Sequence, residues 1–375
     1  MHRFAVPAVL VVVAVLLLGA AAPPPAGWTL YRGDTQLTGR VAANVPALPD
    51  QPRPVWTFEA AGGITSSPSI FNGTVYVGSL DNHVYALDLA TGKQRWKYKA
   101  TDEVKSSPAV RDGAVYFGDE KGAFHALDAA TGAKKWVFQA GSAIPSSPNF
   151  APGCIVFGSY DNSLYCVSPK DGKPVWQVET EAYVHATPAV VGDLILSTGC
   201  DGFLRVVSAK DGKEVRKIPL GGYTAASPAV SGDTAFVGTF ENQFLAVDWK
   251  KGAVLWRHEH PQRKFPFYAS AALGVDKVFA AGRDKYVRAL DLKTGKELWA
   301  FQARSGVDSS PVLAAGRVYA ADKSGEVFAL DARTGKPVWR FEAGSPVESS
   351  PAIAAGRLVI GTNSGTLYAF GARSK

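Results

Sequence analysis

The sequence predicts an all-β fold: an eight-bladed β-propeller of four-stranded antiparallel blades whose ring is closed by the N-terminal strand. First, the tripeptide Ser-Ser-Pro or a near copy recurs at a step of 40 residues, lengthened once to 43. Second, every complete copy contains four short runs of strand-forming residues separated by Gly, Asp and Asn. Third, no segment after residue 25 has a sustained helical period. A fixed period of this size indicates one supersecondary unit used many times. The copies end at Pro68, Pro108, Pro148, Pro188, Pro228, Ala271, Pro311 and Pro351.

One repeat, residues 106–140, shows how each strand is assigned. Strands are expected at 106–110, 114–118, 123–128 and 135–138, because turn residues separate these apolar or alternating runs. The proline falls at the start of the first strand, where a missing N–H costs nothing. One small sheet cannot bury both of its faces. Packing such sheets around an axis covers both faces and leaves only short edges.

The number of copies predicts how the ring closes. There are eight starts, but the eighth copy stops at Lys375 without its own fourth strand. A run that resembles that strand lies at the other end of the chain, around Trp56. We therefore expect this N-terminal strand to complete the last blade. The fourth strand is marked elsewhere by Trp96, Trp136, Trp176, Trp256, Trp299 and Trp339, with Arg216 in the same slot.

The N-terminus and the charge pattern indicate an exported protein that does not bind nucleic acid. A basic start, a short apolar core and small residues predict a signal peptide over 1–21, followed by a lead-in over 22–53 and the propeller over 54–375. An uncleaved membrane anchor is the alternative. After signal removal no stable membrane insertion is expected. The net charge is +7, but the lysines that follow the turn glycines are spread around the ring, which argues against nucleic acid.

Two of the three cysteines, Cys154 and Cys166, fall on neighbouring strands of one blade. An exported protein permits a disulfide there, and two small buried apolar side chains are the alternative. Facing geometry cannot be decided from sequence. The pairing therefore stays open at this point.

A second motif connects the third and fourth strands. Residues 86–96 have the form A-x-D-x-x-T-G-x-x-x-W, which recurs at 126–136, 289–299 and 329–339. The Asp is expected to bond backbone amides, the Gly to adopt a conformation other residues avoid, and the Trp to cover the seam between blades. The motif resembles the tryptophan-docking motif of the pyrroloquinoline-quinone (PQQ) repeat propellers, over about residues 54–375. That superfamily includes the quinoprotein alcohol dehydrogenases and the propeller subunit of the bacterial outer-membrane β-barrel assembly machinery.

The resemblance implies two alternative functions, that of a scaffold and that of an enzyme. The differences between this chain and the enzymes of the superfamily distinguish them. The enzymes hold a quinone over the axis with adjacent cysteines, Ca²⁺ and a catalytic Asp. This chain has no adjacent cysteines and no long insertions between blades. We therefore expect a non-catalytic scaffold for protein–protein interactions in the bacterial envelope, monomeric, without cofactor or metal, and most similar to the assembly subunit. It is expected in the periplasm or outside the cell. The alternative is a dehydrogenase or sensor that binds PQQ with Ca²⁺, or another small ligand, at the mouth of the axial channel.

One position varies freely among the repeats. It precedes the Ser-Ser-Pro slot, so its side chains should surround one mouth of the axial channel. This predicts a small polar site for a cation or a charged partner; a solvated funnel is the alternative. Weak Ca²⁺ binding by Asp308 and Glu348 is a specific hypothesis. The site residues predicted here are Lys105, His185, Tyr268, Asp308 and Glu348.

The 43-residue step marks a second candidate site. The segment 257–268 replaces a short connection and mixes cations with aromatic residues, as exposed recognition loops do. It predicts a partner-binding loop on the same face as the channel mouth, with a tolerated insertion as the alternative. The residues predicted to bind are His258, His260, Arg263, Lys264 and Phe265.

Overall fold

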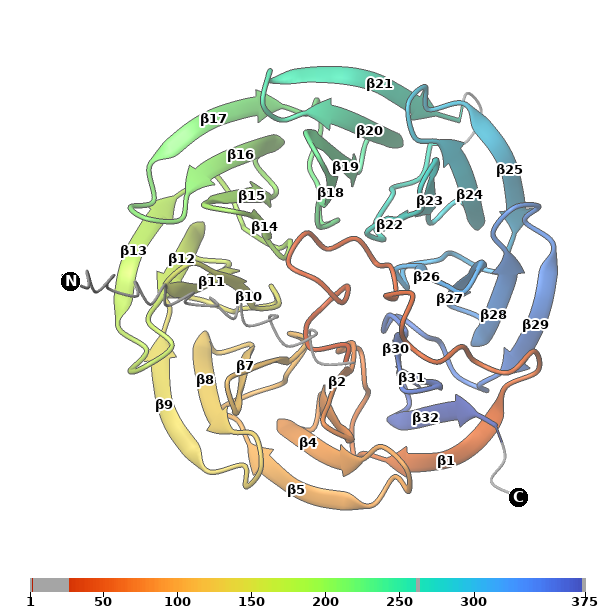
Figure 1. The fold of residues 1–375 in the computed structure, drawn as a ribbon, viewed down its shortest axis with the longest axis horizontal. Coiled ribbons are helices and arrows are strands. Elements are labelled where there is room, and N and C mark those ends of the chain that lie inside the picture. The colour runs from red at the N-terminus through yellow and green to blue at the C-terminus, as the bar shows by residue number, and fades with distance from the viewer. Residues whose placement is uncertain (1, 3–26, 261–263, 373–375) are drawn as a thin grey trace.

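The computed structural model describes residues 2, 27–260 and 264–372, and arranges them as eight four-stranded antiparallel sheets around one axis (Figure 1). The predicted eight-bladed propeller is thereby confirmed. The predicted signal peptide lies outside the described residues, apart from residue 2. Within the described part of the chain, no helix has the length and apolarity needed to span a bilayer.

The blades follow one another in chain order. Blade 1 comprises β2 (Ser69–Phe71), β3 (Thr74–Gly78), β4 (His83–Asp88) and β5 (Gln94–Lys99). Blade 2 comprises β6 (Ala109–Arg111), β7 (Ala114–Gly118), β8 (Ala123–Asp128) and β9 (Lys134–Gln139). Blade 3 comprises β10 (Asn149–Ala151), β11 (Cys154–Gly158), β12 (Ser163–Val167) and β13 (Pro174–Glu179). Blade 4 comprises β14 (Ala189–Val191), β15 (Leu194–Thr198), β16 (Phe203–Ser208) and β17 (Glu214–Pro219).

The second half of the ring repeats this plan. Blade 5 comprises β18 (Ala229–Ser231), β19 (Thr234–Gly238), β20 (Gln243–Asp248) and β21 (Ala253–Glu259). Blade 6 comprises β22 (Ala272–Leu273), β23 (Lys277–Ala281), β24 (Tyr286–Asp291) and β25 (Glu297–Gln302). Blade 7 comprises β26 (Val312–Ala314), β27 (Arg317–Ala321), β28 (Glu326–Asp331) and β29 (Pro337–Glu342). Blade 8 comprises β30 (Ala352–Ala354), β31 (Arg357–Gly361), β32 (Thr366–Gly371) and β1 (Arg53–Glu59).

Blade 8 is shared between the two ends of the chain, as the sequence predicts. Strand β1 is antiparallel to β32, with Thr57 opposite Tyr368 and Glu59 opposite Thr366. The order in this sheet is β1-β32-β31-β30, so the N-terminal strand takes the outermost place. The ring therefore has no open seam at which a strand edge would be exposed.

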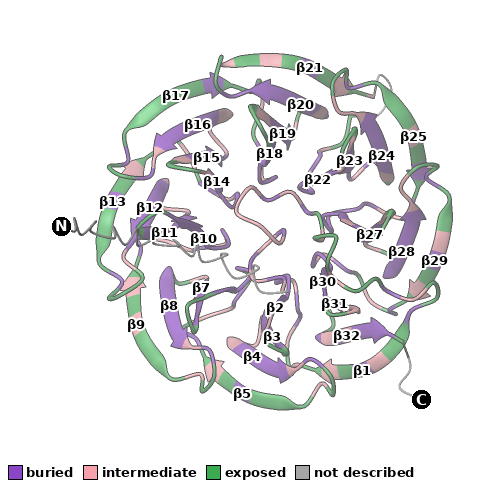
Figure 2. Ribbon diagram, viewed as in Figure 1, coloured by how far each residue is buried: buried purple, intermediate pink, exposed green. Residues whose placement is uncertain are grey.

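Burial follows the distance from the axis (Figure 2). Every residue of β3 is buried, whereas the outermost strand β5 alternates between buried and exposed positions. Middle strands are covered on both faces by neighbouring blades, so they are almost continuously apolar. The outermost strands have one face in water, so they alternate with the strand period.

Two turns in each repeat explain the recurrent Asn, Asp and Gly residues. Asn72 and Gly73 both have positive φ, 46° and 68°, as the tightest hairpin turn requires. In the motif turn, the carboxylate of Asp88 accepts backbone N–H bonds from Ala90 at 3.1 Å and from Thr91 at 2.9 Å. The role predicted for the motif Asp is therefore confirmed.

The motif tryptophans join neighbouring blades. The indole N–H of Trp96 donates to the carbonyl of Ala129 in the next blade at 3.1 Å. Its ring lies against Gly132, where an added Cβ would come within 2.7 Å of the indole. Trp56 makes the same bond to the carbonyl of Leu89 at 2.9 Å and carries the pattern across the closure. In blade 4, Arg216 occupies the tryptophan slot and packs near Gly252.

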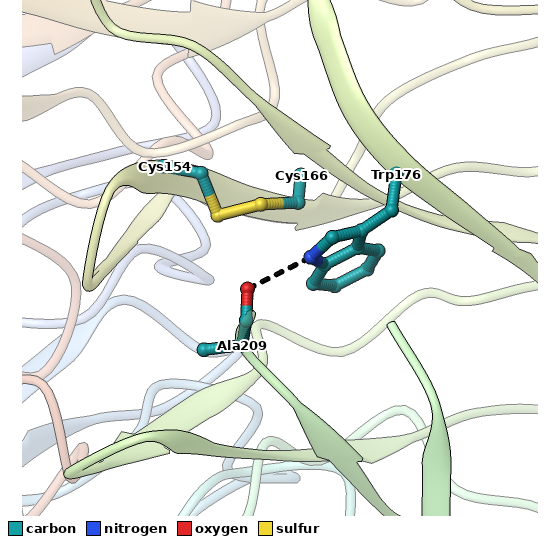
Figure 3. Close-up of a disulfide and its surroundings, with 4 residues drawn as sticks. All are labelled: Cys154, Cys166, Trp176 and Ala209. Carbon is teal, nitrogen blue, oxygen red and sulfur yellow. Dashed lines mark hydrogen bonds between the residues drawn. A yellow bond between two sulfur atoms is a disulfide. The ribbon is translucent and has the colours of Figure 1, made fainter. Parts of the chain in front are cut away.

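Cys154 and Cys166 form a disulfide across β11 and β12, with Cα atoms 5.6 Å apart (Figure 3). Both are buried, beside Trp176, whose indole donates to the carbonyl of Ala209 at 2.8 Å. The pairing that the sequence left open is therefore a bond, and it lies in the seam between blades 3 and 4. Cys200 is the free cysteine.

Residues 27–52 run across the central opening of the ring (Figure 1). They bond to the inner strands of most blades, below the Ser-Ser-Pro slots at which those strands begin. Because the segment is outside the repeat, the sequence predicted no path for it. Its backbone hydrogen bonds are Trp28 with Ile70, Thr29 with Val110, Thr35 with Val190, Gln36 with Val230, Thr38 with Leu273, and Gly39 and Val41 with Leu313.

The connection at the 43-residue step is shorter than predicted. The sequence placed it over 257–268, but β21 continues to Glu259. His258 pairs with Phe244 in that strand and is therefore not part of a loop. The expectation was wrong at this end because the strand period of β21 runs on into the insertion.

Candidate functional site

The axis of the propeller holds a cavity of about 410 Å³ that reaches one face through the starts of the inner strands. We call this face the mouth face; it carries the connections from the fourth strand of each blade to the first strand of the next. Tyr31 of the lead-in lines the bottom of the cavity. Its hydroxyl lies 3.0 Å from Ser310 Oγ and 3.4 Å from Ser270 Oγ. The lead-in therefore converts an axial channel into a cup.

A closed ring of hydrogen bonds forms the lower wall of the cup. Each bond joins the second residues of the Ser-Ser-Pro slots in two successive blades. The backbone N–H of one residue donates to the hydroxyl oxygen of its counterpart in the next blade. The distances are 2.9–3.1 Å. The last bond, from Ser350 N–H to Ser67 Oγ, completes the circle at 2.9 Å. We call these eight residues the serine ring: Ser67, Ser107, Ser147, Thr187, Ser227, Ser270, Ser310 and Ser350.

The five residues that the sequence predicts at the channel mouth all line the cup: Lys105, His185, Tyr268, Asp308 and Glu348. Their placement therefore agrees with the expectation, and their role in binding stays a prediction.

Both predicted carboxylates are paired with cations. Arg283 contacts Asp308 through Nε at 2.9 Å and through a terminal nitrogen at 2.9 Å, and Lys323 Nζ lies 3.2 Å from the same carboxylate. Lys323 Nζ also lies 3.0 Å from Glu348, and this hydrogen bond raises the pKa of the lysine. The two carboxylates are thus engaged rather than free to hold Ca²⁺.

Lys105 is paired in the same way on the opposite side of the cup. Its Nζ lies 2.9 Å from Glu120 and 3.3 Å from Glu103. Burial alone would lower the pKa of Lys105, but the hydrogen bonds and charges of the two glutamates outweigh it and raise that pKa. The lysine is therefore charged at neutral pH.

His185 is held between two tyrosines. Its Nδ1 lies 2.6 Å from the hydroxyl of Tyr160, and its Nε2 lies 3.1 Å from the hydroxyl of Tyr268. Burial lowers the pKa of His185 to about 4, so the ring is neutral at pH 7. Burial also raises the pKa of Tyr160 to about 12. The trio is an uncharged hydrogen-bonded chain across the mouth, between blades 3 and 6.

Exposed aromatic side chains gather on the same side of the mouth face. Tyr183, Tyr223 and Phe265 lie on three successive connections, and they are 51%, 60% and 51% exposed. Tyr160 stacks on Tyr183, with ring centroids 4.7 Å apart. We call Tyr183, Tyr223 and Phe265 the aromatic sector.

The backbone beneath the aromatic sector is fixed. The carbonyl of Tyr183 accepts the N–H of Cys200 at 2.9 Å, and that of Tyr223 accepts the N–H of Phe240 at 2.8 Å. Tyr183 and Tyr223 are therefore presented on backbone that is already ordered, which lowers the entropic cost of binding.

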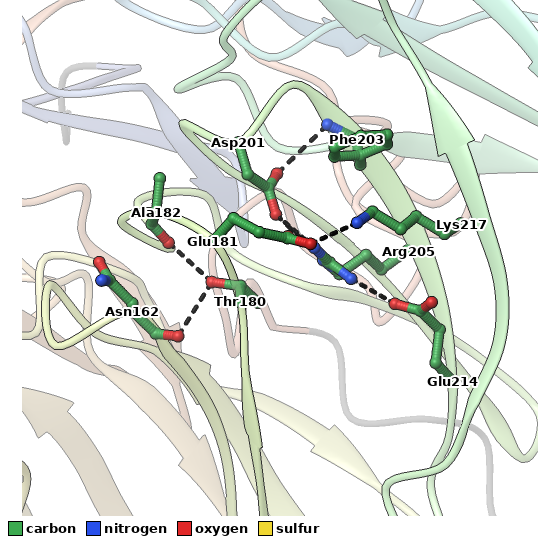
Figure 4. A network of polar contacts seen from close by, with 9 residues as sticks. All are labelled: Asn162, Thr180, Glu181, Ala182, Asp201, Phe203, Arg205, Glu214 and Lys217. Atoms are coloured by element: carbon green, nitrogen blue, oxygen red, sulfur yellow. Dashed lines mark hydrogen bonds and ion pairs between the residues drawn. The ribbon is translucent and has the colours of Figure 1, made fainter.

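A buried ion network anchors the connection that carries Tyr183 and His185 (Figure 4). Arg205, whose side chain is 7% exposed, contacts Asp201 at 2.8 Å and is also paired with Glu181 and Glu214. Glu181 begins this connection, so the network fixes it to blade 4. Lys217 also pairs with Glu181, so three carboxylates share two cations and every charge of the cluster has a partner. The cluster is therefore structural rather than a ligand site.

The predicted partner-binding loop is only partly assembled. Lys264 and Phe265 are exposed on the mouth face. His258 instead lies in the seam with blade 6, its Nε2 3.7 Å from Glu297. His260 is half-buried, with its carbonyl bonded to the Asn242 side chain at 3.1 Å. Arg263 lies outside the described residues.

Sequence reasoning missed the second set of residues that surrounds the cup. Glu120, Tyr160, Arg283 and Lys323 occupy one position of the repeat, in the turn between the second and third strands. They follow the same 40-residue spacing, stretched by three residues once, so a search for a second variable position would have found them. Tyr31 and Arg32 are outside the repeat and gave no such signal.

Comparisons with known proteins agree with this architecture. The family model described as outer membrane protein assembly factor BamB matches residues 40–182, 160–299 and 283–374. The crystal structure of BamB from Moraxella catarrhalis superposes with a TM-score of 0.74 at 18% identity, over 86% of this chain and 100% of that chain. The quinohemoprotein alcohol dehydrogenase from Comamonas testosteroni gives a TM-score of 0.80 at 14% identity, over 93% of this chain and 81% of that one.

A curated relative shares a short stretch of sequence. The quinoprotein ethanol dehydrogenase of Pseudomonas aeruginosa is 42% identical over 69 residues, which is 18% of this chain and 10% of the dehydrogenase. This chain therefore spans about a tenth of that enzyme. The structural likenesses, below 25% identity, establish the fold, whereas the family model covers nearly all of the propeller. The chain belongs to the PQQ-repeat propeller family whose model is described as outer membrane protein assembly factor BamB.

Proposed function

We propose that this protein is an exported, non-catalytic scaffold of the bacterial cell envelope that docks other proteins on its mouth face. The observation that carries this proposal is the aromatic sector. Three large aromatic side chains that are at least half exposed, on successive connections, have the composition of a protein interface rather than of ordinary surface. Membership of the BamB-described family supports the same function.

The aromatic sector has the chemistry that protein interfaces favour. Tyrosine offers a large apolar face together with a hydroxyl that stays satisfied at a wet rim, and it loses little conformational entropy on binding. Lys264 adds an exposed cation beside Phe265. A partner with an apolar patch flanked by carboxylates would complement this surface.

The test replaces Tyr183 and Tyr223 by Ser and captures partners from the native envelope with the tagged full chain. We expect the variant to lose partners that wild type retains. The matched control is Val215→Ser with Leu255→Ser, which removes two apolar side chains, 56% and 53% exposed, from the outermost strands. Both variants should melt within a few degrees of wild type. Equal capture by all three proteins would refute docking on the aromatic sector.

A second candidate is a small-ligand protein of the quinoprotein type, favoured by the presence of a cup on the axis. The residues around the cup do not fit PQQ with Ca²⁺, because Asp308 and Glu348 are already paired with Arg283 and Lys323. Within the described part of the chain, no three His, Cys, Asp or Glu side chains cluster as a metal site. Adding PQQ with Ca²⁺ tests this candidate. A bound chromophore with alcohol-dependent dye reduction would favour it over the scaffold.

A further inference from the structure

The serine ring presents hydrogen-bond donors that the protein itself does not use. A hydroxyl group has one donor and two acceptor sites. Each oxygen of the ring already accepts a backbone N–H from the preceding blade. Among the described residues, Tyr31 makes the only other side-chain contacts with these hydroxyls, at Ser270 and Ser310. The remaining hydroxyl hydrogens therefore need acceptors from within the cup.

A buried cation lies directly beneath this ring of donors. Arg32 is 1% exposed, and its guanidinium centre lies 5.9 Å from the ring of Tyr31. Its terminal nitrogens donate to the carbonyls of Ser310 at 3.1 Å and Ala271 at 2.9 Å, and to that of Pro311. Among the described residues no carboxylate lies within ion-pair distance of it, the charge of Asp34 acts on it only from further away, and its Nε is buried without a hydrogen-bond partner. Such a charge is costly unless an anion compensates it.

The carboxylates at the rim do not cancel the preference of the floor for an anion. Asp308 and Glu348 are paired with Arg283 and Lys323, and Glu120 is paired with Lys105. His185 is neutral and hydrogen-bonded on both sides. With Glu103, which also contacts Lys105, four rim carboxylates are thus paired with three cations, whereas the floor combines unused donors with a cation that makes no ion pair with any described residue.

We propose that the serine ring is a binding site for a compact carboxylate anion, which accepts hydrogen bonds from the ring hydroxyls above the buried charge of Arg32. The cup volume of about 410 Å³ suits a small molecule or a single inserted side chain. A divalent cation is disfavoured because the floor offers donors and positive charge. The site does not depend on docking at the aromatic sector, because none of its residues belongs to that surface.

The carboxylate has two sources, a free small acid or the C-terminus of a peptide, and titration calorimetry on the full chain distinguishes them. The probes are succinate and its uncharged counterpart succinamide, together with a short peptide bearing a free or an amidated C-terminus. Saturable binding of succinate but not succinamide assigns a free acid. Binding of only the free-carboxyl peptide assigns a terminus. Equal binding of charged and amidated probes, or no binding of either, would overturn the proposal.

Four variants test whether the binding depends on the serine ring and the cup. Thr187→Val is nearly isosteric and removes one hydroxyl, so we expect roughly tenfold weaker binding, as for a lost hydrogen bond to a charged group. Thr187→Ser keeps the hydroxyl and should bind within about twofold of wild type. Ala225→Trp fills the cup from its rim and should abolish binding without touching the ring. Arg32→Gln should weaken binding, and if that variant does not fold the other three decide. Affinity unchanged in both Thr187→Val and Ala225→Trp would place the anion elsewhere and contradict the proposal.

Discussion

One position in each repeat, the residue before the Ser-Ser-Pro slot, carries most of the chemical variety of the cup. At this position Lys105, Asp308 and Glu348 form ion pairs, while His185 and Tyr268 form a neutral chain. The serine-ring residue two positions further on is almost invariant because its hydroxyl links consecutive blades. Chemistry thus varies at a position close to a backbone that the serine ring fixes.

The neutral state of His185 gives a pH-dependent prediction. Because burial lowers its folded pKa from 6.5 to about 4, the unfolded chain takes up the proton first as the pH falls. Its contribution to stability is full above pH 6.5 and is lost between that pH and about 4. We expect NMR titration of the full chain to place the imidazole pKa near 4. His185→Gln should show a smaller fall of melting temperature over this window. Titration of His185 at its ordinary value would contradict the burial described here.

At the level of elements, the motif turn and its tryptophan form a joint between blades. Asp88 closes the turn of blade 1 through backbone amides, and Gly92 leaves room for Trp56 of blade 8. The sequence predicted this joint in detail because every copy shows the same pattern. It could not predict that Arg216 would pack at a turn glycine in the same way, because an aliphatic stem substitutes for an indole only where the local fit allows.

The joint is tested by two glycines with the same backbone conformation. The φ angles of Gly132 and Gly113 are nearly the same, 73° and 72°. Only Gly132 faces another residue, the indole of Trp96. Gly113→Ala should cost about 1 kcal/mol from the backbone alone. Gly132→Ala should cost about 1–3 kcal/mol more, because the new methyl group overlaps the indole. Denaturant unfolding measures both losses of stability. Equal losses would show that contact with the tryptophan is not the reason why glycine is needed at position 132.

The disulfide in blade 3 gives a second prediction at this scale. Cys154 and Cys166 are 12 residues apart, and a loop of this size gives about 3 kcal/mol of stabilisation through the unfolded chain. Unfolding in the presence of a reductant should lower the free energy of unfolding by about that amount. The double variant Cys154→Ala with Cys166→Ala should be unaffected by reductant. Three reactive thiols in the denatured, unreduced protein would show that the bond is absent.

At the level of the whole molecule, the repeat predicted the ring and its closure, whereas the cup depends on a segment outside the repeat. Trp56 in β1 could be assigned to blade 8 because the tally of strands required it. The lead-in has no copy of itself to be compared with, so neither its path across the axis nor the burial of Arg32 could be predicted. Likewise Tyr183 and Tyr223 share a repeat position that was not searched for variation.

The lead-in crosses the axis of the propeller and forms the floor of the cup. Hydrogen exchange at single-residue resolution tests whether the lead-in holds this position. The amides that donate to the lead-in should exchange as slowly as those of the blade strands, whereas the equivalent amide of blade 8, Ile353, should exchange faster. The protected amides are those of Ile70, Val110, Val190, Val230, Leu273 and Leu313. Exchange of these six at the rate of an open loop would mean that the lead-in does not close the floor of the cup, and the cup would not exist as described.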